Sequence, residues 1–577
     1  WLDERHLEPK VKLMSFLKID NLNIDYEMRR ETINAARNVN IEVNRGEILG
    51  IVGESGSGKS TVANAIINLI DEPGKISSGS ITLDGINIQE KPETILKYRG
   101  KKIGLIFQDP QTSLNPLITI GDQLIETIQT HLKLNTIDSR IRAINLLKEV
   151  GIKDAENRFN DYPHQFSGGM RQRVVISLAL CCEPELLIAD EPTTALDVSI
   201  QSQILELIKR LTKERNLAVI LITHDMGVIA ETVDRVAVMK NGNLVEIGLT
   251  REILINPKEI YTKSLVSSVP PTNKKISRFK IIEKDNKTQN ETNIKILNRW
   301  NRTKITSQDL VKVKNLHKNF SDGFFTETSK DSLKAVNDVT FNIKEGESFG
   351  LVGESGSGKS TIAKMIVNLF KPNSGDIFFD NICINRIKDK NEMMNFRKQI
   401  QMIFQDPYSS LNGRLKVRDI VAEPIKLHNP LINGKDLESY IYDLLESVEL
   451  SKQSANRFPH EFSGGQRQRI SIARALATQP RLLVCDEPTS ALDVSIQAQI
   501  LNLLKDLQEQ LNLTILFISH DLPVVRQMCD RIGVLRNGEL CEVSDTEKLF
   551  TRPSHDYTKE LLNLMPKIES IYDEYKL

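Results

Sequence analysis

The stretch Gly53-Glu54-Ser55-Gly56-Ser57-Gly58-Lys59-Ser60-Thr61 occurs twice in this chain. It returns letter for letter as Gly353-Glu354-Ser355-Gly356-Ser357-Gly358-Lys359-Ser360-Thr361. Each copy fits G-x-x-x-x-G-K-S and stands between an apolar run and a helical pattern, which predicts a phosphate-binding loop. Its glycines let backbone N–H groups turn inward around phosphate oxygens, and the helix N-terminus adds a positive dipole. The lysine would reach the β- and γ-phosphates, and the last serine would bind Mg²⁺.

The repeat extends over most of the chain, so two copies of one domain are joined head to tail. The other repeated segments are Phe-Gln-Asp-Pro at 107 and 404, Ser-Gly-Gly at 167 and 463, Asp-Glu-Pro-Thr at 190 and 486, His-Asp at 224 and 520, and Tyr-Thr-Lys at 261 and 557. We expect domains at 14–270 and 311–577. Residues 271–310 are rich in Lys, Asn, Thr and Asp and predict an exposed linker. Residues 1–13 precede Met14 and are expected to be a tag or an upstream extension.

Short apolar runs in the first copy each end at a polar residue, at 48–52, 186–189 and 219–223. Longer helical patterns separate them, as at 200–211, and 496–511 shows the same pattern in the second copy. This alternation predicts an α/β domain with a largely parallel core sheet, and functional residues are expected at the carboxyl ends of its strands.

Three polar residues follow these runs in each copy. Asp190 and Asp486 end apolar runs, which places a carboxylate near the expected metal. The next residues, Glu191 and Glu487, are predicted general bases that polarise the attacking water. His224 and His520 end the next strand and are predicted to contact the γ-phosphate. Since both copies keep the glutamate and the histidine, we expect two hydrolytically competent sites.

The composition is that of an ordinary globular protein. Hydrophobic residues make up 40% and charged residues 26%, and 76 Lys and Arg balance 76 Asp and Glu. This balance gives no bulk attraction to nucleic acid or anionic lipid. The apolar runs are strand-length, so we expect no membrane span. The cysteines show no CxxC spacing, which favours a reducing compartment.

The Ser-Gly-Gly segments, with Gln108, Gln405 and the turns at 195–197 and 491–493, resemble the signature, Q-loop and D-loop of ATP-binding cassette (ABC) proteins. This resemblance implies two tandem nucleotide-binding domains, each with a mainly parallel core sheet, an antiparallel β subdomain and a helical subdomain. It also implies bound ATP and Mg²⁺, with Gln108 and Gln405 as further metal ligands. Tyr26 and Phe320 align where the family stacks its adenine ring, although an aromatic at a strand end can equally belong to the core.

The resemblance further implies that each ATP lies in a composite site built from both cassettes, which ATP closes and hydrolysis reopens. One site would pair the first set of catalytic residues with Ser463, Gly464, Gly465 and Gln466. The other would pair the second set with Ser167, Gly168, Gly169 and Met170. One chain would then supply a complete pair of cassettes.

Ser-Leu-Asn after Phe-Gln-Asp-Pro, the Pro-His lead-ins at 163 and 459 and the Tyr-Thr-Lys tails are similar to the oligopeptide/dipeptide/nickel importer branch. That similarity implies an ATPase on the cytoplasmic side of the inner membrane, two permease subunits as partners and, indirectly, a substrate-binding protein. The transported compound, such as a peptide, glutathione, a microcin-like compound or nickel, stays open.

A second class has two cassettes as well, the ribosome-associated ABC proteins of the translation-factor type. Those typically carry a long, charged helical linker and a basic surface. Here the linker has poor helical periodicity and the net charge is +0. The importer class is therefore favoured, and no nucleic-acid partner is expected.

Overall fold

The computed structural model describes residues 15–29, 32–90, 92–193, 196–280, 295–300, 308–320, 333–490 and 492–565. The predicted extension at 1–13, Ala195, Ala491 and much of the linker lie outside these residues. The described residues divide into two compact units. Unit 1 holds residues up to Leu196 together with Ile200–Lys263, and unit 2 holds those of Ser264–Met565 together with Asp197–Ser199.

Unit 1 is built on one sheet whose described strands follow the order β5-β4-β1-β2-β10-β9-β3-β8-β7-β6. These strands are β1 (Leu17–Glu27), β2 (Thr32–Val43), β3 (Ile48–Val52), β4 (Gly74–Leu83), β5 (Ile86–Asn87), β6 (Ile103–Ile106), β7 (Leu186–Asp190), β8 (Ala218–Ile222), β9 (Arg235–Lys240) and β10 (Asn243–Leu249). The helices are α1 (Lys59–Ile66), α2 (Pro92–Tyr98), α3 (Pro110–Ser113), α4 (Ile120–Leu132), α5 (Thr136–Glu149), α6 (Ala155–Arg158), η1 (Pro163–Gln165), α7 (Gly168–Leu180), α8 (Val198–Arg215), α9 (Met226–Thr232), α10 (Thr250–Ile255) and α11 (Ile260–Ser267).

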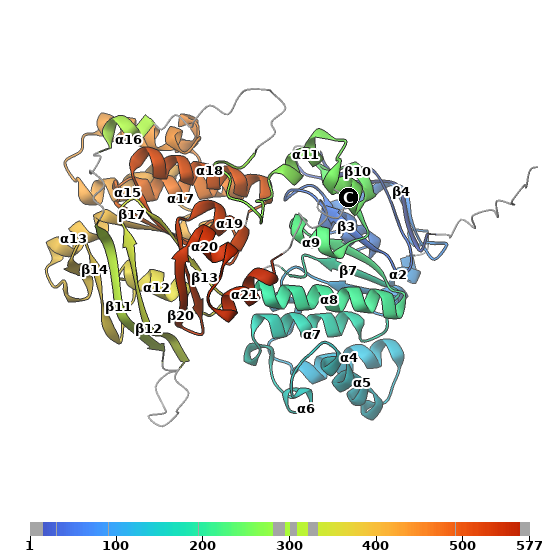
Figure 1. Cartoon of the computed structure of the whole chain (residues 1–577). Coiled ribbons are helices and arrows are strands. Elements are labelled where there is room, and N and C mark those ends of the chain that lie inside the picture. The colour runs from blue at the N-terminus through green and yellow to red at the C-terminus, as the bar shows by residue number, and fades with distance from the viewer. Residues whose placement is uncertain are drawn as a thin grey trace, which may run out of the picture. The chain divides into compact units, whose positions relative to one another are not determined.

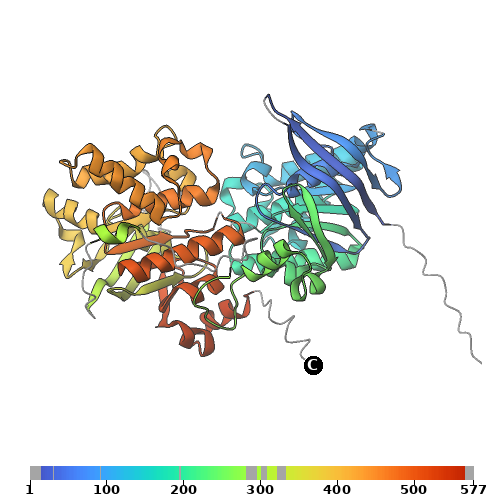
Figure 2. The same cartoon turned by 90° about the horizontal axis from the view of Figure 1, so that it is seen from above.

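The two halves of this sheet differ in strand direction. β3 pairs in parallel with β8 and β9, and β7 pairs in parallel with β6 and β8. β1 pairs antiparallel with β2 and β4, and Figure 2 shows these long strands in blue. β3 and β8 are buried along their whole length, as expected for parallel strands covered on both faces.

The helices between β6 and β7 form a group of their own in unit 1. α4, α5 and α7 contact one another, and Figure 1 shows α4 and α5 together beyond α7 and α8. Side-chain caps fix where α4, α5 and α7 begin. Thr119, Asn135 and Ser167 each accept the backbone N–H three residues on. This group is the helical subdomain.

Unit 2 repeats the same plan with its described strands assigned to separate sheets, β12-β11-β14-β15 and β16-β17-β18-β13-β19-β20. The strands are β11 (Asp309–Phe320), β12 (Leu333–Lys344), β13 (Ser348–Val352), β14 (Ser374–Phe379), β15 (Ile382–Cys383), β16 (Ile400–Ile403), β17 (Leu482–Asp486), β18 (Thr514–Ile518), β19 (Arg531–Arg536) and β20 (Glu539–Asp545). The helices are η2 (Lys295–Arg299), α12 (Lys359–Ile366), η3 (Ile384–Arg386), α13 (Lys390–Gln399), α14 (Pro407–Ser410), α15 (Val417–His428), α16 (Gly434–Ser447), η4 (Lys452–Asn456), η5 (Pro459–Glu461), α17 (Gly464–Leu476), α18 (Val494–Leu511), α19 (Leu522–Met528), α20 (Thr546–Thr551) and α21 (Asp556–Asn563). The predicted fold class is confirmed, with its parallel core, antiparallel strands and helical subdomain.

The segment that we expected to be an exposed linker packs on unit 2 in its described parts. Phe279, Ile296 and Trp300 are buried in the same apolar core as α16 and α18. The prediction of an exposed segment is therefore wrong for these residues, because apolar side chains too sparse to show periodicity still reach the core. Among the described residues, no helix is both long and apolar enough to span a bilayer.

Candidate functional site

The two Gly-rich loops follow β3 and β13 and lead into α1 and α12. Gly58 and Gly358 adopt left-handed backbone angles, with φ of 98° and 101°. A Cβ at either position would collide with a backbone carbonyl oxygen, that of Ala35 or Ala335. These positions therefore require glycine, because other residues rarely adopt this conformation and have no room here.

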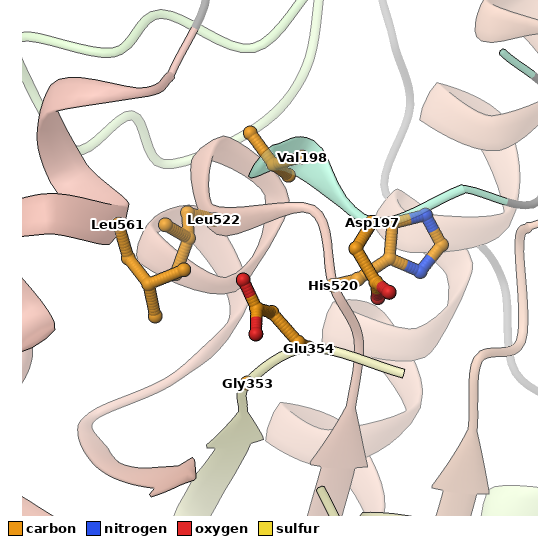
Figure 3. Close-up of a pocket in the computed structure, with 7 residues that line it drawn as sticks. All are labelled: Asp197, Val198, Gly353, Glu354, His520, Leu522 and Leu561. Carbon is orange, nitrogen blue, oxygen red and sulfur yellow. The ribbon is translucent and has the colours of Figure 1, made fainter. Parts of the chain in front are cut away.

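The loop lysine is buried in both units and is held by the loop itself. Lys59 Nζ donates to the carbonyl oxygens of Gly53 at 2.8 Å and Glu54 at 2.9 Å. Lys359 repeats these bonds with Gly353 at 2.7 Å and Glu354 at 2.8 Å. Burial lowers the pKa of Lys359, although nearby carboxylates oppose this. Figure 3 shows Gly353 and Glu354 after β13, beside His520 and Leu522.

The predicted glutamate, histidine and glutamine meet in each unit. Glu191 lies 3.0 Å from His224, measured from Oε1 to Nδ1, and Gln108 Nε2 donates to its other oxygen at 2.8 Å. In unit 2, Glu487 Oε1 lies 3.2 Å from Nδ1 of His520, and Gln405 Nε2 donates to Glu487 Oε2 at 3.0 Å. Both glutamates have left-handed backbone angles, with φ of 48° and 47°. Such outliers in non-glycine residues are enriched at functional sites.

The charges of the second site depend on one another. Burial lowers the pKa of His520, but the hydrogen bond and charge of Glu487 outweigh it and leave this pKa above its usual value. Burial raises the pKa of Glu487, yet its bond to His520 and the charges of His520 and Lys359 leave it below the usual value. The pair is thus held as carboxylate and imidazolium over a widened pH range.

A serine and an aspartate next to each lysine form an oxygen-donor pair. Ser360 Oγ donates to Asp486 Oδ1 at 2.9 Å, and Ser60 hydrogen-bonds to Asp190 in the same way. Burial raises the pKa of both aspartates, so a buried carboxylate there gains from a nearby cation. Gln108 and Gln405 donate to the neighbouring glutamates, and their role as further metal ligands stays a prediction.

The remaining predicted residues lie apart from this cluster. Ser167 and Ser463 cap α7 and α17, and each accepts the backbone N–H three residues on at 3.4 Å, from Met170 and Gln466. Tyr26 is half-buried against the core at the end of β1. Phe320 is 39% exposed and packs edge-on against Phe370. The adenine-stacking role of both aromatics stays a prediction.

One contact of the first loop escaped the sequence reasoning. The backbone N–H of Glu54 donates to the hydroxyl of Tyr261 at 3.2 Å, which joins the tail of unit 1 to its phosphate-binding loop. In unit 2 the repeated residue Tyr557 is buried, and burial raises its pKa to about 12, with Glu354 beside it. The repeated Tyr-Thr-Lys segment was the available signal.

Comparisons with known proteins identify the family of the two repeated units. The profile of the family described as "ABC transporter" matches residues 36–194 and 336–490. The profile described as "Oligopeptide/dipeptide transporter, C-terminal region" matches 245–295 and 541–576.

Curated relatives match over nearly the whole chain. The glutathione import ATP-binding protein GsiA of Shigella dysenteriae is 42% identical over 96% of this chain and 90% of its own. Its counterpart in Escherichia coli K12 is 41% identical over the same shares. A solved dimeric ATP-binding cassette with ADP and Pi is 34% identical, covering 41% of this chain and 98% of that chain with a TM-score of 0.37. The chain therefore belongs to the ABC transporter family, as an ATP-hydrolysing subunit with two cassettes, each followed by a C-terminal region of the oligopeptide/dipeptide transporter type.

Proposed function

We propose that this chain powers an importer of peptides or peptide-like compounds. The observation that carries the proposal is the repeated cluster of a buried lysine, a glutamate and a histidine, followed in both cassettes by the oligopeptide-type tail. The relatives named as glutathione import proteins, which match 96% of the chain, support the same direction of transport.

The residues have distinct roles in the proposed hydrolysis. Lys59 and Lys359 exchange loop carbonyls for the β- and γ-phosphate oxygens of ATP. Glu191 and Glu487 accept the proton of the attacking water, and the histidines hold the geometry of glutamate and water. Gln108 and Gln405 donate to these glutamates, so each glutamine would release its glutamate before that carboxylate accepts a proton from water.

The oxygen donors at each site fit Mg²⁺. Ser60 with Asp190, and Ser360 with Asp486, offer the hydroxyl and carboxylate ligands that Mg²⁺ takes alongside phosphates. Gln108 and Gln405 would complete each set after leaving the glutamates. The bound ion would neutralise charge on the β- and γ-phosphates.

The proposal extends to how the two cassettes share their ATP sites and which proteins they bind. We propose that 14–270 and 311–577 are the two cassettes with their tails, and that one chain supplies both. ATP would close them at two composite sites, with Ser167 to Met170 serving one ATP and Ser463 to Gln466 the other. Two permease subunits and, indirectly, a substrate-binding protein would be partners, at the cytoplasmic side of the inner membrane.

The test is a mild-detergent pull-down of the tagged chain from native membranes, with every co-purifying protein identified. Two multi-spanning permease subunits would support the importer role, and an accompanying binding protein would narrow the cargo. Recovery of ribosomes without a permease would refute the transport role and leave the ATPase activity intact.

A further inference from the structure

The segment between the cassettes contributes two described pieces to unit 2, residues 271–280 and 295–300, which together we name the strap. Each piece buries apolar side chains. Phe279 is 1% exposed and Ile296 0% exposed, within the core that includes α16, α18 and α19. Figure 1 shows η2, the second piece, beside α16. The strap is thus part of the packing of unit 2.

Side chains of α18 and α19 hold the first piece mainly by its backbone. Asn502 accepts the N–H of Phe279 at 2.9 Å and donates to its carbonyl oxygen at 3.0 Å. Gln527, which is fully buried, donates to the carbonyl oxygens of Pro271 at 3.0 Å and Lys274 at 2.9 Å. It also accepts the N–H of Ile276 at 2.6 Å. Bonds of this kind fix the path of the chain with little dependence on its side chains.

Charges add specificity to this contact. Arg278 lies 2.8 Å from Asp506 and 2.6 Å from Glu509 on α18. Lys505 Nζ donates to the carbonyl oxygens of Ile276 at 3.1 Å and Ser277 at 3.0 Å. Lys505, Asp506 and Glu509 therefore all lie on the face of α18 that contacts the strap.

The first cassette lacks the matching surface. The repeat aligns Asp506 with Arg210 and Glu509 with Lys213, so Arg278 would meet two positive charges there. It also aligns Asn502 with Glu206 and Gln527 with Glu231, which removes amide donors toward strap carbonyls. The strap therefore fits only the second of the two repeated surfaces, and like charges oppose the wrong pairing.

The strap contacts α19, the helix that follows His520 in the sequence. Gln527 lies in α19, whose N-cap Asp521 accepts the N–H of Val524 at 3.1 Å and directly follows His520. Lys275 Nζ donates to the carbonyl oxygen of Cys529 at 2.9 Å, at the other end of this helix. A helix of this length moves as one body, so a contact at its C-terminal end fixes the backbone beside His520.

We propose that the strap is a positioning element of the second site, which holds α19 and thereby keeps His520 against Glu487. This inference rests on the proposed roles of these two residues. Gln527 is the positioning residue through which the strap acts. Misplacing a catalytic group by about 1 Å can cost roughly 100-fold in rate, so a partial release is expected to cost about tenfold.

The experiment uses the full chain with Glu191→Gln, which silences the first site, and adds either Gln527→Glu or Asp506→Arg with Glu509→Lys. Each change installs residues of the first cassette. We expect faster amide exchange across 272–279 and a turnover number about tenfold lower, with the KM for ATP changed less than about twofold. If His520 moves away from Glu487, it loses the carboxylate that raises its pKa. The part of the pH–rate profile that reports His520 should therefore shift to lower pH.

Two further variants make the test specific. Arg278→Glu, added to the charge-reversed chain, should restore both exchange protection and turnover. The matched control, Arg210→Asp with Lys213→Glu in the first cassette, should leave second-site turnover unchanged.

A released strap with normal turnover and an unmoved pH profile would overturn the positioning role, and so would undiminished protection after charge reversal. Absence of turnover in the Glu191→Gln parent, whose strap is intact, would instead refute the assignment of Glu487 and His520.

Discussion

Replacing each catalytic glutamate by glutamine isolates the contribution of each site. Glutamine has the same shape as glutamate and can keep one bond each to the neighbouring histidine and glutamine, so the loops should stay in place. In Glu191→Gln the amide cannot take a proton from water. In Glu487→Gln the amide likewise cannot take a proton from water. Its position next to His520, 3.2 Å from Nδ1 in the wild type, should be kept.

The magnitude follows from the number of sites. A positioned general base contributes about 10²- to 10⁴-fold. If both sites hydrolyse ATP at similar rates, each single variant should retain at most about half of the wild-type turnover. The double variant should retain about 1% or less.

Phosphate release by the purified chain measures these rates, with Glu206→Gln on the exposed face of α8 as the control for charge loss. Thermal unfolding checks that each variant is folded. A single variant with full wild-type turnover would show that its site does not hydrolyse ATP and would refute the expectation of two competent sites. A double variant with a tenth of the activity or more would exclude the glutamates as bases.

Three other perturbations test separate parts of the structure. The wild type should be more stable to unfolding than Glu487→Gln because Glu487 pairs with protonated His520. This difference in stability should be complete below the usual pKa of His520, and it should vanish as pH rises through the raised pKa that His520 has in the folded protein. At acid pH it should vanish again as Glu487 is protonated below its usual range, as thermal unfolding across pH would show. Gly358→Ala should abolish nucleotide binding at the second site, because a Cβ collides with backbone there, whereas Gly413→Ala meets open space and should bind a fluorescent ATP analogue normally. Phe279→Ala should lower the unfolding free energy of the second cassette by about 3–5 kcal/mol in urea titrations.

The sequence was sufficient for the core of each site because its chemistry demands particular residues at particular strand ends. The runs at 48–52 and 186–189 became β3 and β7, and 219–223 overlaps β8. The glutamates and histidines then met because carboxyl ends of neighbouring parallel strands lie at one edge of a sheet. The spacing of these residues along the chain and the adjacency of their strands together determine that the glutamates and histidines meet.

Other contacts could not be read in advance. The hydrogen bond from Gln108 to Glu191 was not expected, because spacing along the chain does not say which partner a flexible side chain takes. The strap escaped notice since Asn502 and Gln527 bind its backbone, which every sequence shares. Its polar composition resembles a linker. Its few large apolar residues, Ile276, Phe279, Ile296, Leu297 and Trp300, are too widely spaced to show a period.

The opposite charges at Asp506 and Arg210 also bear on how such a chain can be rearranged. A gene in which the two halves were exchanged would encode every catalytic residue and every phosphate-binding glycine. Yet the connecting segment would then lead into a cassette bearing Arg210 and Lys213, which repel Arg278. The surface charges of the two cassettes therefore favour one order of the halves. Experiments that exchange cassettes between such proteins should transfer the connecting segment together with the second cassette.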